Sequence, residues 1–186
     1  MSFKSHRLKG LVSTLLLVII PIMFGIASGS LLLSGLSFNI NTYLLIVNIV
    51  SHIVVFILFI MAMRGFAEYY NDSKIFKNSL YAVIMGITGI ITAPIVSYIV
   101  DLFSPNILFL VLILVYMTVI AIPTGVFYRN AFYALEEKSG QQHFKHAGWL
   151  MFIGGITTVI VIGVFVIFLG RMFATLEFYS MKPKSS

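Results

Sequence analysis

Five long apolar stretches constrain this chain more than any other feature of its sequence. Four of them, residues 11–33, 43–63, 79–103 and 107–128, run for more than 20 residues with almost no charge, and the fifth covers residues 147–180. About 20 apolar residues in a helix match the hydrocarbon core of a bilayer, whereas membrane strands alternate apolar and polar residues. The pattern predicts an all-α, polytopic bundle of transmembrane helices that forms a single domain over residues 1–186.

The composition agrees with a membrane protein and narrows its partners. The chain is 60% hydrophobic and only 10% charged, whereas soluble domains carry about 25% charged residues. Twelve Lys and Arg against six Asp and Glu give a net charge of +6. Basic residues beside apolar stretches fit anionic lipid headgroups, so we expect a lipid bilayer as partner and no nucleic acid. The absence of cysteine excludes disulfides and thiolate metal sites.

The N-terminus has two interpretations. Lys4, Arg7 and Lys9 precede the first apolar stretch, as in a signal peptide, and the small residues at positions 27–29 resemble a cleavage site. The apolar run of about 23 residues is longer than a signal peptide requires. We therefore expect an uncleaved first span.

The last stretch, residues 147–180, leaves the number of spans open. A single helix of 34 residues would be about 50 Å long, against a hydrocarbon core of roughly 30 Å. Lys and Arg number three before the first span, none at 34–42, three at 64–78, none around Pro105 and three at 129–146. This alternation predicts a cytoplasmic N-terminus and cytoplasmic connections at 64–78 and 129–146. A hairpin turning near Gly163 would return Lys182 and Lys184 to the same side, which favours six spans; five is the alternative.

Apolar residues repeat at helical spacing beyond the ends of the second and fourth stretches, so both helices are expected to extend past the membrane. The repeats are Met63, Phe66, Ala67 and Tyr70, and then Tyr128, Ala131, Phe132 and Leu135. Turn-forming residues follow each repeat, at 71–73 and 139–140. Asp72 or Ser73 is expected to cap the next helix.

Four polar residues within the apolar stretches are candidate site positions: Asn48, His52, Asp101 and Arg171. Polar side chains at membrane depth usually face the bundle interior, where they serve either packing or function. Asn48 and His52 lie one helical turn apart and share a face of the helix. Either an interhelical hydrogen bond or a functional site explains why these polar residues lie in an apolar stretch. We predict that Asp101 and Arg171 form an ion pair.

Small residues at close-packing spacing mark candidate helix contacts. Gly25 and Gly29 form a GxxxG pair in the first stretch, and Gly86 and Gly89 belong to two small-residue stripes in the third. Such stripes let helix backbones approach closely in a bilayer. We expect the third helix to be central in the bundle.

Two segments resemble an archaeal family of integral membrane proteins known only as domain of unknown function 996. The first reads Phe-Ala-Glu-Tyr-Tyr-Asn-Asp-Ser-Lys-Ile-Phe-Lys-Asn-Ser-Leu-Tyr over residues 66–81. The second covers residues 136–155 and continues through Phe-Tyr-Ser-Met-Lys at 178–182. The resemblance implies a multi-pass protein of an archaeal plasma membrane and supplies no activity, ligand or site residue.

Catalytic and cofactor motifs are missing from the sequence, which contains no HExxH, GxSxG or phosphate-binding glycine loop. His143 and His146, with Glu136 and Glu137 nearby, are explained either as metal ligands or as a pair at the membrane interface. Gly140 separates the acids from the histidines, which favours the interfacial pair. We predict no catalytic, cofactor or metal site.

Two classes of function fit these features. An accessory or self-assembling subunit of a membrane complex needs close-packing glycines and interfacial aromatics, and its partners would be other membrane subunits or a second copy. A small-solute transporter or channel would use the prolines Pro21, Pro94 and Pro123 together with the intramembrane polar residues. We place the accessory role first, and we do not expect an enzyme.

Overall fold

The computed structural model describes residues 2–34, 38–103, 107–158 and 162–183, which form six helices. Within these ranges, the structure does not describe the side chains of residues 24–34, 38–42, 44–45, 101–103, 107 and 109–110. The helices are α1 (Phe3–Ser34), α2 (Phe38–Tyr70), α3 (Ser73–Phe103), α4 (Ile107–Ser139), α5 (His143–Thr157) and α6 (Ile162–Ser180). The described residues contain no strand. The prediction of an all-α membrane bundle is confirmed.

Five segments of these helices are long and apolar enough to cross a bilayer: Phe3–Met23, Ile46–Tyr70, Ser73–Val100, Val111–Ser139 and Ile162–Ser180. The chain is therefore a multi-pass membrane protein by helix length and hydropathy. Residues 147–180 divide between two helices, α5 and α6, as the hairpin interpretation requires. Helix α5 has only 15 residues, about 22 Å, so its length alone does not qualify it as a sixth span.

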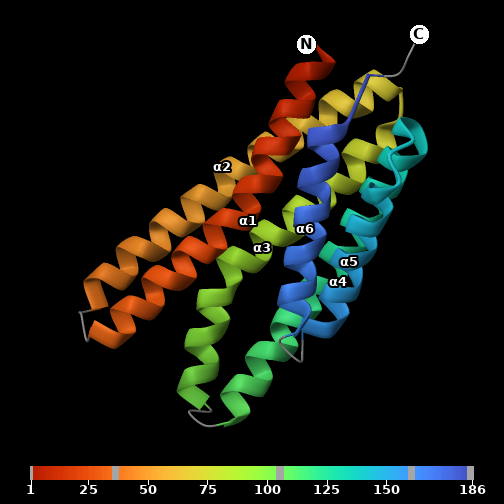
Figure 1. The fold of residues 1–186 in the computed structure, drawn as a ribbon. Helices are drawn as coiled ribbons and strands as arrows, with labels where there is room; N and C mark the ends of the chain where they lie inside the picture. Colours follow the sequence, from red (N-terminus) through yellow and green to blue (C-terminus); the bar gives the residue numbers. More distant parts are fainter. Residues whose placement is uncertain (1, 35–37, 104–106, 159–161, 184–186) are drawn as a thin grey trace.

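The six helices form a ring in chain order. Each helix packs against its neighbours in the sequence, and α1 packs against α6 to close the ring. The prediction that the third helix is central is wrong, because among the described residues α3 packs only against α2 and α4. Both termini lie at one end of the bundle, together with the α2–α3 and α4–α5 connections (Figure 1). Lys138 Nζ and Asp72 Oδ2 lie 3.9 Å apart and link these two connections. We call this end the terminal end.

Local chemistry explains where the helices break at the terminal end. Asn71 has a left-handed backbone, with φ of 53°, and the Asp72 carboxylate accepts a 2.9 Å hydrogen bond from the Lys74 N–H. Asp72 is thus the cap that the sequence predicted for α3. Gly140 ends α4 with φ of +74°, and its N–H donates to the Glu136 carbonyl at 2.8 Å. Both predicted breaks are confirmed.

Aromatic side chains fill the ring at its terminal end. The fully buried ones are Phe59, Phe66, Phe132, Phe144 and Phe178. Their rings are in mutual contact; the Phe144 and Phe178 centroids, for example, lie 4.9 Å apart. The two predicted apolar repeats supply much of this core, which confirms that α2 and α4 continue beyond the apolar stretches with one buried face.

Glycines bring α4, α5 and α6 into close backbone contact. A methyl group added at Gly155 of α5 would lie 2.6 Å from the Ala121 carbonyl oxygen of α4. A methyl group at Gly148 would lie 2.9 Å from Cα of Arg129. Close approach of this kind stabilises helix pairs in membranes through van der Waals contact.

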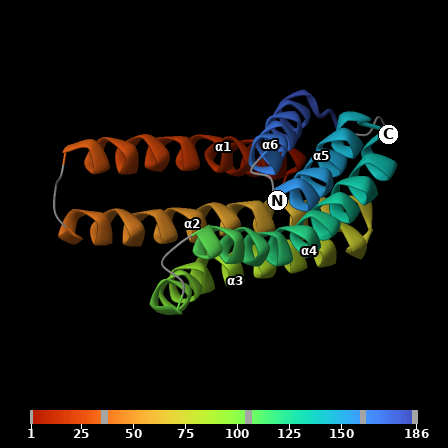
Figure 2. The same cartoon turned by 90° about the horizontal axis from the view of Figure 1, so that it is seen from below.

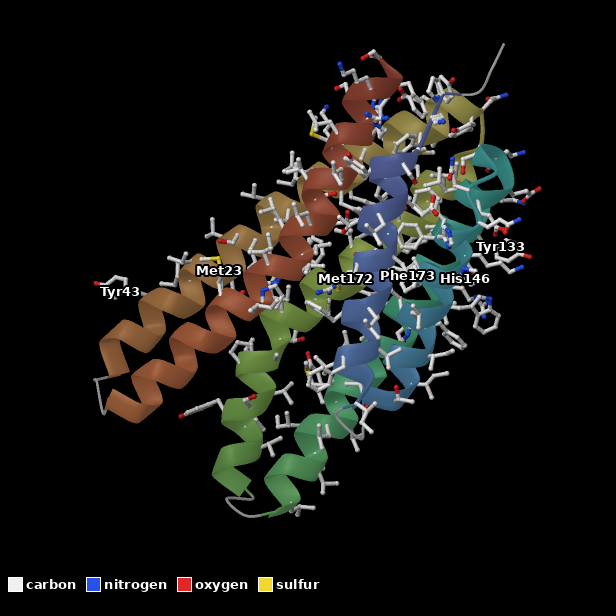
Figure 3. The ribbon with its side chains drawn as sticks, viewed as in Figure 1. Met23, Tyr43, Tyr133, His146, Met172 and Phe173 are labelled. Atoms are coloured by element: carbon white, nitrogen blue, oxygen red, sulfur yellow. The ribbon has the colours of Figure 1, made fainter. Side chains whose placement is uncertain are left out.

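Away from the terminal end, the α1–α2 hairpin separates from the other helices, as both views show (Figures 1 and 2). Met23 of α1 and Tyr43 of α2 lie on this projecting part (Figure 3). Their side chains are 63% and 71% exposed, respectively. This part of the hairpin is therefore open to lipid or to another protein.

Candidate functional site

Arg171 lies midway along α6 and forms a polar link to the adjacent helix α1. Its Nη1 donates a 3.0 Å hydrogen bond to the backbone carbonyl of Leu17 in α1. In an α-helix that carbonyl would accept from the N–H of residue 21, but residue 21 is proline and has no N–H. Arg171 therefore satisfies the carbonyl that Pro21 leaves without a helical partner, as proline within a membrane helix requires.

A cavity of about 290 Å³ lies beside Arg171, between α3, α4, α5 and α6. Its walls are mainly small and apolar, with Gly86, Gly89 and Ala93 on the α3 side and Met151 on the α5 side. The polar groups that line it, besides Arg171, are those of Thr124 and Tyr128. The cavity is thus an apolar chamber with one cationic side chain in its wall.

Two further polar side chains lie within electrostatic range of Arg171. Tyr128 of α4 is only 7% exposed and interacts with the arginine charge. His52 of α2 also lies close enough to interact with that charge. Arg171 thus interacts with α1 through the hydrogen bond and with α2 and α4 through these two side chains, and it shares the cavity wall with residues of α3 and α5.

Asn48 and His52 form a contact within one helix. His52 Nδ1 lies 2.9 Å from the Asn48 backbone carbonyl, to which it donates, and the His52 ring lies 6.3 Å from the Phe56 ring. The contact uses the backbone of Asn48 and joins no second helix. Both side chains are half-buried, on the inward face of α2.

The structure describes the surroundings of two of the other predicted positions, Gly86 and Gly89. A methyl group at Gly89 would lie 2.7 Å from Cγ2 of Ile120, and one at Gly86 would lie 3.3 Å from Phe56. The surroundings of Gly25 and Gly29 and the side chain of Asp101 lie outside the described residues. The ion pair between Asp101 and Arg171 therefore stays a prediction.

A second polar cluster lies at the terminal end. Glu177 of α6 is only 2% exposed, and its Oε1 lies 3.8 Å from Nε2 of the exposed His143. Its Oε2 has no hydrogen-bond partner among the described residues. The His143 and His146 rings lie 5.7 Å apart. Within the described part of the chain, no three His, Asp or Glu side chains are grouped closely enough to hold a metal ion.

Sequence reasoning missed the Leu17 carbonyl, the role of Tyr128 and the cavity. A signal for the first was present, because a proline in a membrane helix frees the carbonyl four residues earlier. The sequence does not identify the partner of that carbonyl, since Leu17 and Arg171 are 154 residues apart. The position of Tyr128 in the cavity wall depends on how α4 is rotated against its neighbours.

Comparison with known proteins finds related sequences of unknown activity. Uncharacterized protein MJ1644 of Methanocaldococcus jannaschii is 23% identical over 136 residues, which cover 68% of this chain and 76% of that protein. No solved structure matches the chain. Residues 51–172, which include Arg171 and the cavity wall, match the family described as "Protein of unknown function (DUF996)". The chain belongs to the DUF996 family.

Proposed function

We propose that this chain is a non-enzymatic subunit that acts by assembling in the plasma membrane, with copies of itself or within a larger membrane complex. Its basic terminal end would face the cytoplasm, in accordance with the positive-inside rule. The multi-pass helices, and a sequence without the HExxH, GxSxG or phosphate-binding glycine motifs, support this role.

An exposed stripe on α2 carries the proposal. Its side chains are spaced alternately three and four residues apart, as in the seam between two packed helices. They are Val47, Val50, Val54, Ile57 and Met61, all between 42% and 55% exposed. The stripe begins four residues after Tyr43, which lies on the projecting part of the hairpin (Figure 3). Packing of these apolar side chains against another helix would be favourable in a bilayer.

The test is purification from the native membrane in a mild detergent, followed by mass spectrometry and a mass measurement of the intact particle. We expect a stoichiometric partner or an oligomer. Val50→Trp, within the stripe, should break the assembly. Val119→Trp is the matched control, because Val119 is 62% exposed on α4, outside the stripe. A monomer without partners, or equal effects of both variants, would contradict the proposal.

A second candidate function, transport of a small solute, is favoured by one observation. Arg171 and Tyr128 line one cavity from two helices, and His52 of a third helix lies within electrostatic range of Arg171. Convergent polar groups within a membrane bundle are typical of substrate pathways. Solute flux into liposomes that depends on His52, measured with His52→Ala on the reconstituted chain, would favour transport over assembly.

A further inference from the structure

We propose that the cavity beside Arg171 binds an amphiphile with one anionic oxygen headgroup, of the carboxylate or phosphate class, and an apolar tail. The headgroup would contact the guanidinium and the tail would occupy the apolar chamber. This ligand site goes beyond the assembly function and does not depend on it, because such a ligand can be bound in a monomer or in a complex.

The charge of Arg171 provides the first argument. A guanidinium has five N–H donors, and among the described residues it donates one hydrogen bond, to the Leu17 carbonyl. No described carboxylate lies within ion-pair distance of it. A cation in apolar surroundings is costly unless it is paired, and the planar guanidinium matches the two oxygens of a carboxylate or phosphate. An anionic headgroup would compensate the charge.

The cavity wall provides the second argument. A volume of about 290 Å³ is near the lower limit for sites that hold small organic ligands. Gly86, Gly89 and Ala93 leave this space open on the α3 side. The hydroxyl of Thr124 is already bonded to the carbonyl of Ile120 in its own helix, at 2.7 Å. Water needs several polar partners, so this wall suits an alkyl chain better than a water cluster.

The position of Tyr128 explains a preference for a headgroup that accepts hydrogen bonds. Its side chain lines the cavity and lies within electrostatic range of Arg171. A phenol hydroxyl donates one hydrogen bond. Arg171 and Tyr128 would then offer donors from two different helices to the same anionic group.

The experiment uses the full chain in lipid nanodiscs and a dodecanoate probe that carries a photoreactive diazirine at the end of its tail. Mass spectrometry then maps the labelled residues. We expect saturable labelling of the cavity wall on α3 and α4, and about tenfold weaker labelling in Arg171→Gln. Arg129→Gln is the matched control: Arg129 lies over the rings of Trp149 and Phe152, and its loss should leave labelling unchanged.

Three further arms make the test decisive. Ala93→Phe keeps Arg171 but fills the chamber, so it should abolish labelling even if Arg171→Gln fails to fold. The matching dodecanol probe lacks the charge and should label about tenfold less. Asp101→Asn removes the predicted acid partner. Unchanged labelling in Ala93→Phe, or equal labelling by dodecanol, would overturn the proposal. So would labelling that occurs only in Asp101→Asn. Full displacement of the probe by inorganic phosphate would also overturn it and would identify a site for a free anion.

Discussion

The guanidinium of Arg171 donates a 3.0 Å hydrogen bond to the backbone carbonyl of Leu17, and this bond joins α6 to α1 where the ring of helices closes. Pro21 removes the amide that would otherwise occupy this carbonyl. Pro21 thus removes one hydrogen bond within α1 and leaves the Leu17 carbonyl free to accept a hydrogen bond from α6. The bond supplies a polar link at the closure of the ring, within a bundle that is otherwise held together mainly by apolar contacts.

Pro21→Ala should be coupled energetically to Arg171→Leu. In the wild type, Arg171→Leu leaves the Leu17 carbonyl without a partner, whereas in Pro21→Ala the new amide of residue 21 takes its place. We expect a coupling free energy of about 1 kcal/mol, typical of interhelical hydrogen bonds in membranes. A double-mutant cycle, measured by reversible unfolding in mixed detergent micelles, checks this value.

The control for that cycle is Pro123→Ala combined with Arg171→Leu. Pro123 of α4 frees the carbonyl of Val119, whose side chain is 62% exposed, on a face turned away from the bundle interior. The two changes should be additive. Coupling of equal size in both cycles would show that the effect has nothing to do with the Leu17 carbonyl.

Gly155→Ala should lower the free energy of unfolding by about 1–3 kcal/mol. The added methyl would lie 2.6 Å from the Ala121 carbonyl oxygen, so α4 and α5 would have to separate. Gly86→Ala is the matched control, since its nearest neighbour is the end of the Phe56 ring at 3.3 Å, which can move. The same unfolding assay should show a smaller loss for Gly86→Ala; the reverse order would contradict the observed packing of α5.

The features that could be predicted from the sequence are those that depend on local physics. Helical spacing of apolar residues revealed the buried faces of α2 and α4. Asp72 revealed where α3 begins, and Gly140 revealed where α4 ends. These signals need only a few consecutive residues, because a cap or a left-handed turn is decided within one helical turn.

Features that depend on helix rotation could not be predicted. The sequence singled out four glycines by their spacing, but of these Gly86 and Gly89 face side chains of Phe56 and Ile120, whereas helix backbones approach each other closely at Gly125, Gly148 and Gly155. A glycine promotes packing only when its face is turned toward a neighbour, and that is a tertiary property. Likewise, the sequence identified Arg171 as a candidate, but the contacts of its guanidinium depend on which helix closes the ring.

Phe178→Ala should lower the free energy of unfolding by about 3–5 kcal/mol. Its ring is fully buried and contacts the rings of Phe66 and Phe144, so truncation would open a cavity in the terminal core. The neighbouring Tyr179 is 72% exposed, and Tyr179→Ala should change stability by less than about 0.5 kcal/mol. Thermal unfolding monitored by circular dichroism distinguishes the two variants, and a Phe178→Ala variant as stable as Tyr179→Ala would refute the aromatic core.

Glu177→Gln should increase stability. Glu177 is buried, one of its carboxylate oxygens lacks a partner among the described residues, and its neighbour His143 is exposed. The neutral amide has nearly the same shape without the desolvation cost of a charge. His143→Gln should lower stability in the wild type and have no effect in Glu177→Gln, which chemical unfolding of the four proteins at one pH would show. An equal loss in both backgrounds would mean that the pair does not interact.

The position of the two ends of α5 decides how many times the chain crosses the membrane. The chain contains no cysteine, so single cysteines can be introduced and labelled with a maleimide that does not cross membranes. Both termini and the α2–α3 and α4–α5 connections lie at the terminal end, which requires an even number of crossings if every helix passes through.

We predict that Asn71→Cys and Gln141→Cys react from the cytoplasmic side and that Thr157→Cys reacts from the opposite side. Helix α5, at 15 residues, would then cross only where the bilayer thins or where neighbouring helices shield its ends. Labelling of Thr157→Cys from the cytoplasmic side, or from neither side, would leave the five long segments as the only crossings among the described residues.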